Sequence, residues 1–568
     1  MRLKHFIILV VGFSAAQIVF AVPPVTISQN PTAPIIPDRP SATRPEPPKF
    51  KPKKAQPGLT VPDTPAKKSV AEDASTRIFA KGFRFNGHTV FSDAELEAIA
   101  EPYTERELSI AELEQLRYLL TQHYVEHGYL SSGAVLPSQS FNDGIIEFKI
   151  IEGTLNEIRI SGTEHLNPDY VKDRLMLGAG PPLNSAELQE RFSLLLQDPL
   201  IERMEGRLAP GLTAGQSLLD LSVTRAQPYQ LSLSTDNHRP PSTGAVQGRL
   251  DGLVRNLTGF GDTLDISLGY SEGSFTYGGG FSIPINRYDT RLSFRAYASQ
   301  SSIVEEPLED INIESKLRGF EFAIEQPVYR SLERSFSVGA RIAVRKNRST
   351  LEGDSFSFEQ GDEDGTSKVS TLRFYQDYSE RDPQQVFAAR STFNVGIKAF
   401  DATWNNDGTA DGDFFSWLGQ VQYARLVMDN GAQIQFRGDV QLSNDGLLAL
   451  EQFALGGANS IRGYRENELV RDQGFALSLE FRYPLLSGTD FPGSLTVIPF
   501  MDYGGSWDVS KSKDIEYLHS VGLGFVWTPI NQVTAELFYA HDLNTARSKP
   551  EYDLQDDGVH FRLSYQIL

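Results

Sequence analysis

The strongest constraint on the fold lies in residues 227–568, where long segments alternate between apolar and polar side chains. A period of two places the two kinds of side chain on opposite faces of a β-strand. In one segment, 474–484, the polar set includes Glu480 and Arg482. Charged groups are costly in a dry core but suit a water-filled interior. Most of these segments are also long enough to cross a bilayer as tilted strands, which takes roughly 9–11 residues.

A soluble β-sandwich also alternates, so two further features decide between the alternatives. Aromatic side chains stand near the segment ends, as a membrane-interface belt requires; examples are Tyr270, Tyr483 and Tyr565. Sixteen such segments can be counted, and the connections alternate between long (443–473) and short (529–530). Both features are typical of an outer-membrane barrel, and an even strand number puts both barrel ends in the periplasm. We therefore predict a 16-stranded antiparallel transmembrane β-barrel over 227–568.

The N-terminal region predicts export. Residues 1–21 combine a basic start with an apolar stretch and small-residue cleavage chemistry, which is typical of a signal peptide. A membrane anchor is the alternative, although the stretch is short for a spanning helix. Residues 22–75 hold thirteen of the 32 prolines, and proline fixes φ and removes a donor. We expect a Pro-rich linker there.

Between the linker and the barrel, the order strand, helix, helix, strand, strand is expected in residues 76–153. Ser92 can cap a helix over 92–100, and Ser109 with Glu112 can form a capping box for a second helix that ends at Gly128.

The same order recurs in residues 154–226. A helix is expected at 167–177, Ser185 is expected to cap another, and 219–223 is expected to be a strand. Repetition of one supersecondary unit indicates tandem modules, so the prediction is two α/β modules before the barrel.

Charge and motifs exclude several function classes. The formal net charge of −20 opposes binding to nucleic acid, whose phosphates require clustered Lys and Arg. The chain has no cysteine and no His-Glu-x-x-His motif. His123 and His127 stand one turn apart and could ligate a metal, but solvated positions near the end of a helix are the simpler interpretation. The acidic run 359–364 could hold Ca²⁺, but an ordinary solvated loop is again the simpler interpretation. We predict no catalysis, cofactor or metal.

Several motifs resemble those of the two-partner secretion transporters (TpsB proteins) within the outer-membrane insertase superfamily. In the two modules, which look like POTRA domains, the matching stretches are Phe85–Gly87, Leu136–Gln139, Ile151–Gly153 and Leu208–Gly211. At the start of the barrel they are Asp236–Asn237 and Asn256–Asp262. Arg239 departs from the family, where glycine is usual.

The most specific match lies in the sixth long connection. Its residues Ile461, Arg462, Gly463 and Tyr464 resemble the family's loop signature, with isoleucine in place of the commoner valine. Phe500, Asp502 and Gly504 resemble the partner motif on strand 13. The resemblance implies that the loop folds back into the barrel and that Arg462 pairs with Asp502. We refer to this pair as the latch.

The resemblance also implies a function. The chain is expected to secrete a large TpsA-like partner polypeptide, unfolded in transit, across a Gram-negative outer membrane, with its modules in the periplasm. Outer-membrane lipid and the barrel-assembly machinery are its other expected partners. An assembly factor of the same superfamily, a passive channel and an outer-membrane enzyme are the alternatives.

Overall fold

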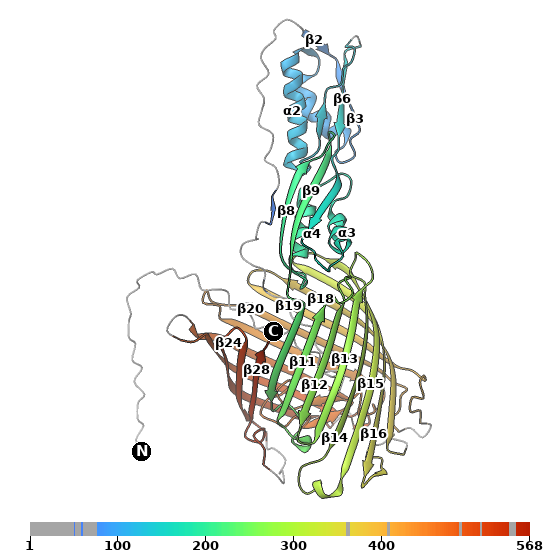
Figure 1. Ribbon diagram of the computed structural model, residues 1–568, viewed down its shortest axis with the longest axis vertical. Helices are drawn as coiled ribbons and strands as arrows, with labels where there is room; N and C mark the ends of the chain where they lie inside the picture. The colour runs from blue at the N-terminus through green and yellow to red at the C-terminus, as the bar shows by residue number, and fades with distance from the viewer. Residues whose placement is uncertain are drawn as a thin grey trace, which may run out of the picture.

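The computed structural model describes Phe50, residues 58–60 and residues 77–568, except 142, 359–363, 406–408, 488–490, 512–513 and 545–551. The predicted signal peptide, nearly all of the predicted linker and most of the acidic run 359–364 lie outside the described residues. The described chain has two stacked α/β modules above one end of a closed barrel (Figure 1).

The predicted barrel is confirmed. Its long strands are β10 (Tyr229–Asp236), β11 (Gln247–Arg255), β12 (Thr263–Ser271), β13 (Ser274–Pro284), β14 (Arg291–Ser302), β15 (Ile313–Arg330), β16 (Arg334–Leu351), β18 (Thr366–Arg381), β19 (Gln385–Gly396), β20 (Phe415–Leu426), β21 (Gln433–Ser443), β24 (Gln473–Ser487), β25 (Ser494–Trp507), β26 (Glu516–Ile530), β27 (Val533–Asp542) and β28 (Val559–Gln566). Each pairs antiparallel with its neighbours, and β10 closes the barrel against β28. A two-residue strand, β17 (Asp354–Ser355), extends the edge of β16.

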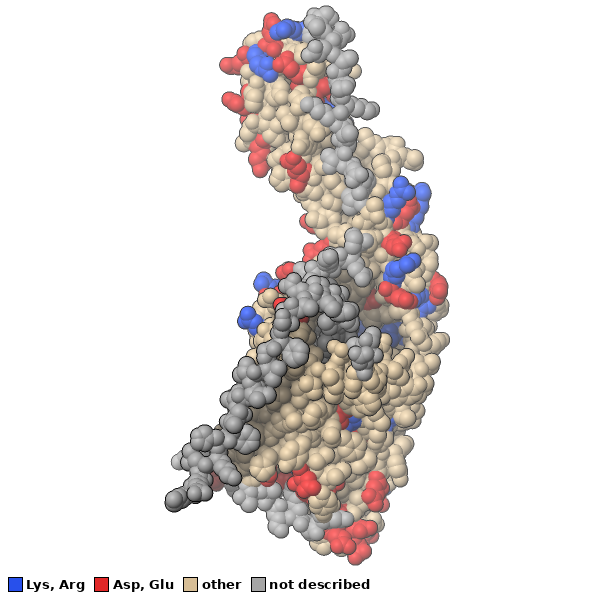
Figure 2. Space-filling model, turned by 90° about the vertical axis from the view of Figure 1, so that its left-hand side faces the viewer, with Lys and Arg blue, Asp and Glu red and all other residues tan. Residues whose placement is uncertain are grey.

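The alternation of side chains sorts by face. On β24, Leu477 and Leu479 are exposed on the outside, whereas Ala476 and Ser478 are buried inside. Figure 2 shows a barrel wall that is largely free of charged side chains, with acidic side chains at the rim far from the modules. An apolar outer band with polar residues inside is the arrangement that a lipid-embedded barrel requires.

The first module contains β2 (Arg77–Ala80), β3 (Gly82–Asn86), α1 (Asp93–Ala100), β4 (Arg106–Ser109), α2 (Ile110–Glu126), β5 (Gly133–Val135) and β6 (Ile145–Ile151). Both expected capping residues act, since Ser92 and Ser109 form capping boxes with Glu95 and Glu112. The β2–β4 pair was not expected from the sequence.

The carboxylate of Glu152 ties the end of this module together. It accepts hydrogen bonds from the backbone of Thr89 and Val90 at 2.7 and 2.9 Å and from the Tyr124 hydroxyl at 3.0 Å. Burial raises the pKa of Glu152, but hydrogen bonds from Thr89, Val90 and Tyr124 lower it by more, so the net shift is downward.

The second module contains β7 (Thr154–Ser161), α3 (Pro168–Leu175), α4 (Ser185–Leu195), β8 (Ile201–Pro210) and β9 (Gln216–Arg225). Two expectations need correction. Asn184, not Ser185, caps α4, because its side-chain oxygen accepts from the Ala186 amide at 2.9 Å. Strand β8 was missed, since Gly206 and adjacent charged residues interrupt its alternation.

The second module docks on the barrel rim. Asn167, the N-cap of α3, donates its backbone N–H to the Gly259 carbonyl at 2.9 Å, in the turn between β11 and β12. Arg174 is 8% exposed and pairs through Nε with Asp289 of the β13–β14 turn at 3.0 Å. A Cβ at Gly261 would lie 2.3 Å from the Tyr170 ring, so this contact needs glycine.

Within the part of the chain that the structure describes, none of the helices combines the length and the apolar character needed to span a bilayer.

Candidate functional site

The connection between β21 and β24, residues 444–472, folds into the barrel and is called the lumenal loop below. Two short strands inside it, β22 (Phe453–Leu455) and β23 (Leu469–Arg471), pair with each other. Its residues Phe453, Leu455 and Ile461 are at most 1% exposed, since they pack against the inner barrel wall. The loop therefore has a fixed conformation across the lumen.

The latch residues meet inside the barrel. The Arg462 guanidinium donates through Nε and Nη2 to the two Asp502 oxygens, both at 2.8 Å, and the Arg462 backbone N–H donates to Oδ2 at 3.1 Å. Arg462 is 3% exposed and Asp502 is 1% exposed. A bidentate guanidinium–carboxylate pair combines charge with fixed geometry. Removing one partner of such a buried pair costs about 3–5 kcal/mol, because the other charge is left uncompensated.

Strand register builds the rest of the latch pocket. Ser478 of β24 lies opposite Asp502 of β25, and Glu480 lies opposite Phe500, so all four face inward. Arg462 donates through Nη1 to Glu480 at 2.7 Å and through Nη2 to Ser478 at 3.0 Å. Its guanidinium carbon also stands 3.5 Å from the centre of the Phe500 ring, a cation–π contact.

The neighbours of Arg462 fix its position. Ile461 is fully buried, and a Cβ at Gly504 would lie 3.0 Å from its Cδ1, so glycine leaves room for the isoleucine. Gly463 has φ +93°, a conformation that favours glycine. The Tyr464 hydroxyl donates to the His519 carbonyl at 3.0 Å. Each predicted latch residue thus has a structural task.

A second anchor, which the sequence did not reveal, holds the first half of the loop. Glu451 is 1% exposed and pairs with Arg345 of β16 and Arg373 of β18. Arg373 Nη2 lies 2.9 and 3.1 Å from the two Glu451 oxygens. These arginines stand on the strands numbered seven and eight from β10, whereas Asp502 stands on the thirteenth. The loop is therefore tied to two separate sectors of the wall.

A third set of contacts ties the loop to other connections. Arg465 donates to both oxygens of Asp556, each at 2.7 Å, and also pairs with Glu305. The Gln555 side chain accepts from the Glu466 amide at 2.8 Å and donates to the Asn237 carbonyl at 2.6 Å. Because Asn237 follows β10, these contacts connect the loop to the seam between the first and last strands.

Parts of the barrel interior are dry. Leu447 and Leu448 of the loop are buried against Val369 and Phe414, and Leu450 packs on Tyr297 and Leu317. The expected water-filled lumen is thus partly filled by apolar side chains of the loop. Apolar burial adds to the ion pairs in holding the loop in place.

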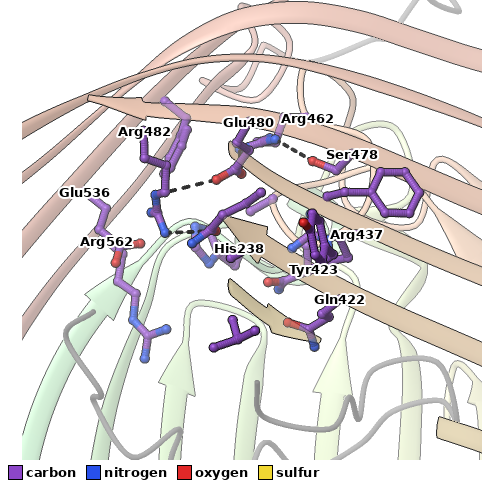
Figure 3. Close-up of a pocket in the computed structure, with 17 residues that line it drawn as sticks. His238, Gln422, Tyr423, Arg437, Arg462, Ser478, Glu480, Arg482, Glu536 and Arg562 are labelled. Carbon is purple, nitrogen blue, oxygen red and sulfur yellow. Dashed lines mark hydrogen bonds and ion pairs between the residues drawn. The ribbon is translucent and has the colours of Figure 1, made fainter. Parts of the chain in front are cut away.

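A cavity of about 230 Å³ lies between the loop tip and the barrel wall (Figure 3). Its charged lining residues are Arg437, Arg462, Arg482, Arg562, Glu480 and Glu536. Glu480 lies between Arg462 and Arg482, at 2.7 and 3.7 Å. Arg462 of the loop therefore shares the cavity lining with three arginines of the barrel wall.

No group of three or more metal-ligating side chains occurs among the described residues. The rings of His123 and His127 lie with their centres 4.5 Å apart, tilted by 56° to each other, beside Phe91. Their arrangement is that of a packed ring cluster at the end of α2.

Comparison with protein families gives two matches. Residues 215–526 match haemolysin secretion/activation proteins of the ShlB/FhaC/HecB type. Residues 78–153 match the ShlB-type POTRA domain.

Individual relatives are distant but cover most of the chain. The outer membrane transporter CdiB of Dickeya dadantii is 23% identical over 405 residues, which are 69% of this chain and 70% of that protein. The heme/hemopexin transporter HuxB of Haemophilus influenzae is 22% identical over 507 residues, 81% of this chain and 82% of that protein.

Solved structures share the fold. CdiB from Escherichia coli superposes with a TM-score of 0.66 at 20% identity, covering 88% of this chain and 93% of that one. BamA from Haemophilus ducreyi without its POTRA domains 1–3 gives a TM-score of 0.52 at 14% identity, covering 86% and 100%.

Proposed function

Because the chain belongs to the ShlB/FhaC/HecB family of haemolysin secretion/activation proteins, we propose that its modules capture one large partner polypeptide, which then passes through the barrel. The protein is an outer-membrane two-partner secretion transporter and not an enzyme. The partner of such a transporter is a TpsA protein.

The lumenal loop carries this proposal. In the described conformation it crosses the barrel interior and is held by Arg462, Glu451 and Arg465. A polypeptide passing through the lumen would need this loop to move. Such a movement would break these ion pairs and withdraw the apolar side chains of the loop from the inner wall.

We propose that the modules, in the periplasm, bind the partner while it is extended. Addition of a strand to a sheet edge uses backbone hydrogen bonds, so it demands little of the partner's sequence. Docking of the second module through Asn167 and Arg174 would hold the captured chain at the barrel mouth.

The driving force for export in one direction would not come from this chain. The sequence contains no nucleotide-binding motif, so folding of the partner on the cell surface would drive export. The barrel-assembly machinery would insert the protein, and lipid would cover its apolar wall. The names of the relatives refer to different cargoes, heme/hemopexin for HuxB and hemolysin for HpmB of Proteus mirabilis. We therefore propose only the class of the partner of this chain, a large secreted polypeptide.

Export of the polypeptide encoded in the neighbouring reading frame tests the proposal. Wild-type chain should release it into the medium, and Arg462→Ala should abolish release. Arg471→Ala is the matched control, because Arg471 belongs to the same loop but is 30% exposed in its ion pair with Glu516. Normal release by Arg462→Ala, with an unchanged channel conductance, would contradict a role of the latch in export.

A further inference from the structure

Basic side chains gather on the outer face of the barrel, across three neighbouring strands. Strand register places Arg318 of β15 opposite Lys346 of β16, and Lys346 opposite Lys368 of β18. One step nearer the strand ends, Lys316 lies opposite Arg348. The second module docks on the β13–β14 turn, so the start of β15 and the end of β16 lie at the other rim of the barrel (Figure 1). We call these five residues the basic patch.

The contacts of the lumenal loop show which face of each strand points inward. Leu317 of β15 packs against Leu450 of the loop. Arg345 of β16 and Arg373 of β18 pair with Glu451 of the loop. Side chains alternate between the two faces of a strand, and the residues of the basic patch stand an odd number of positions from these inward residues. The basic patch therefore points outward, toward lipid.

Three members of the patch have polar partners within the chain. Lys316 Nζ lies 3.2 Å from a carboxylate oxygen of Glu314, and Lys368 Nζ lies 3.8 Å from one of Asp401. Arg348 donates to a serine hydroxyl at 3.1 Å. Within the described parts of the chain, two carboxylates thus pair with members of a patch of five cations.

The two central members, Arg318 and Lys346, are exposed and form no ion pair with a described residue. Like charges directly opposite each other on neighbouring strands are destabilising, so this arrangement costs free energy unless an anion lies beside it. Elsewhere the same rim carries aromatic rings on its outer face. Tyr503 of β25 and Tyr517 of β26 are exposed and stack with ring centres 5.9 Å apart. The row of cations is therefore a local feature of β15, β16 and β18.

Apolar side chains follow the patch toward the middle of the barrel wall. Phe320 lies opposite Val344, and in the next row Ile342 lies between Phe322 and Leu372. A step of two residues along a strand is about 7 Å, so the first apolar row lies that far from the central cations. Clustered cations above an exposed apolar band match an amphiphile with an anionic headgroup and acyl chains.

We propose that the basic patch binds a phosphorylated glycolipid of the outer leaflet. The phosphate groups of the lipid lie beside Arg318 and Lys346, and its acyl chains lie along Phe320 and Phe322. The proposed periplasmic position of the modules places the opposite rim, and with it the patch, in the outer leaflet. Guanidinium and ammonium groups form strong charge-assisted hydrogen bonds with phosphate, and a bound phosphate removes the repulsion within the row.

Lipid binding by the full-length chain in detergent tests this inference. The probes are lipid A with two phosphates and the same lipid without phosphates. The wild-type chain should bind the phosphorylated lipid at least tenfold more tightly. Arg318→Gln should weaken that binding at least threefold, and adding Lys346→Gln should abolish the preference for phosphate. Arg425→Gln is the matched control, because Arg425 is exposed beside the inward Ala424 at the other end of the wall, and it should bind like wild type.

Thermal unfolding without lipid separates a lost site from a lost fold. Both substitutions remove repelling charges, so the variants should unfold at the wild-type temperature or above it. Equal binding of the two lipids by the wild-type chain would overturn the inference; a patch occupied by the chain's own acidic run 359–364 predicts that result. Unchanged binding after both substitutions, or equal weakening by Arg425→Gln, would overturn it as well.

Discussion

Two segments of this chain, the lumenal loop and a short N-terminal strand, are held against larger parts of the fold in different ways. The lumenal loop is tied by buried charges: Arg462 to Asp502 and Glu451 to two arginines. Strand β1 (Leu59–Thr60), at the sheet edge of the second module, is held by a two-residue pairing with β8 and by one buried leucine. The loop is thus held by distributed ion pairs together with apolar burial, whereas β1 is held by one local apolar contact.

The difference indicates that the two segments are held with different free energies. Burial of one leucine side chain is worth about 1.5–3 kcal/mol, whereas breaking each buried ion pair of the loop costs about 3–5 kcal/mol. Strand β1 should therefore leave its site more often than the loop leaves the lumen.

The largest effect is expected from breaking the latch. Arg462→Ala should destabilise the docked loop by about 3–5 kcal/mol, because Asp502 and Glu480 then lose their shared guanidinium. Combining it with Asp502→Ala should cost less than the sum of the single changes, since the pair is coupled. Protease cleavage within 444–472 of the detergent-solubilised chain measures this. Additive effects would contradict a coupled pair.

Removing the second anchor should have a somewhat smaller effect. Glu451→Ala should loosen the first half of the loop by about 3 kcal/mol, because Arg345 and Arg373 lose their shared carboxylate. Glu451→Gln keeps the shape and an acceptor, so its effect should be smaller. Cleavage near Leu447 should rise in the order wild type, Gln, Ala. Equal cleavage in all three would show that this anchor does not hold the loop.

Weakening the apolar contact of β1 should cost less free energy than breaking either ion-pair anchor of the loop. Leu59→Ala should weaken the strand by about 2 kcal/mol, which is roughly 30-fold in its equilibrium. The Gly206 amide, which donates to Gly58, should then exchange its hydrogen about that much faster. The amide of Leu219, inside the sheet on β9, is the control and should not change. A Gly206 amide that exchanges at the wild-type rate would mean that Leu59 does not hold β1.

The smallest effect is expected at Tyr464. Tyr464→Phe removes one hydroxyl, which donates to the His519 carbonyl and accepts from the His519 amide at 3.3 Å. The net value of such a hydrogen bond is about 1 kcal/mol. Loop cleavage should therefore rise only slightly, and a loss as large as that of Arg462→Ala would show that the ion pair is not the dominant contact.

Much of the fold was predictable because its signals are local. Alternation over nine or more residues identifies a strand, and Ser109 with Glu112 three residues later identifies a helix start. The latch was predictable only through the resemblance, since the spacing of Arg462 and Asp502 carries no signal of its own.

The remaining features depend on distant partners. Glu451 lies 106 residues from Arg345 and 78 from Arg373, so nothing in either neighbourhood marks the pair. Strand β1 has two residues in a Pro-rich stretch, and it gains its conformation from the edge of β8. By contrast, the apolar run Leu447-Leu448-Ala449-Leu450 is a local signal for the apolar contacts at the base of the loop.

Thiol labelling in this cysteine-free chain tests most directly whether the latch holds the loop inside the barrel. Ile461 is fully buried beside Arg462, while Asn459, two residues away, is exposed. The Ile461→Cys thiol should resist a hydrophilic maleimide, the Asn459→Cys thiol should react quickly, and adding Asp502→Ala should make the Ile461→Cys thiol reactive. Equal reactivity of the two thiols in the otherwise unchanged chain, or continued protection after Asp502→Ala, would contradict the account.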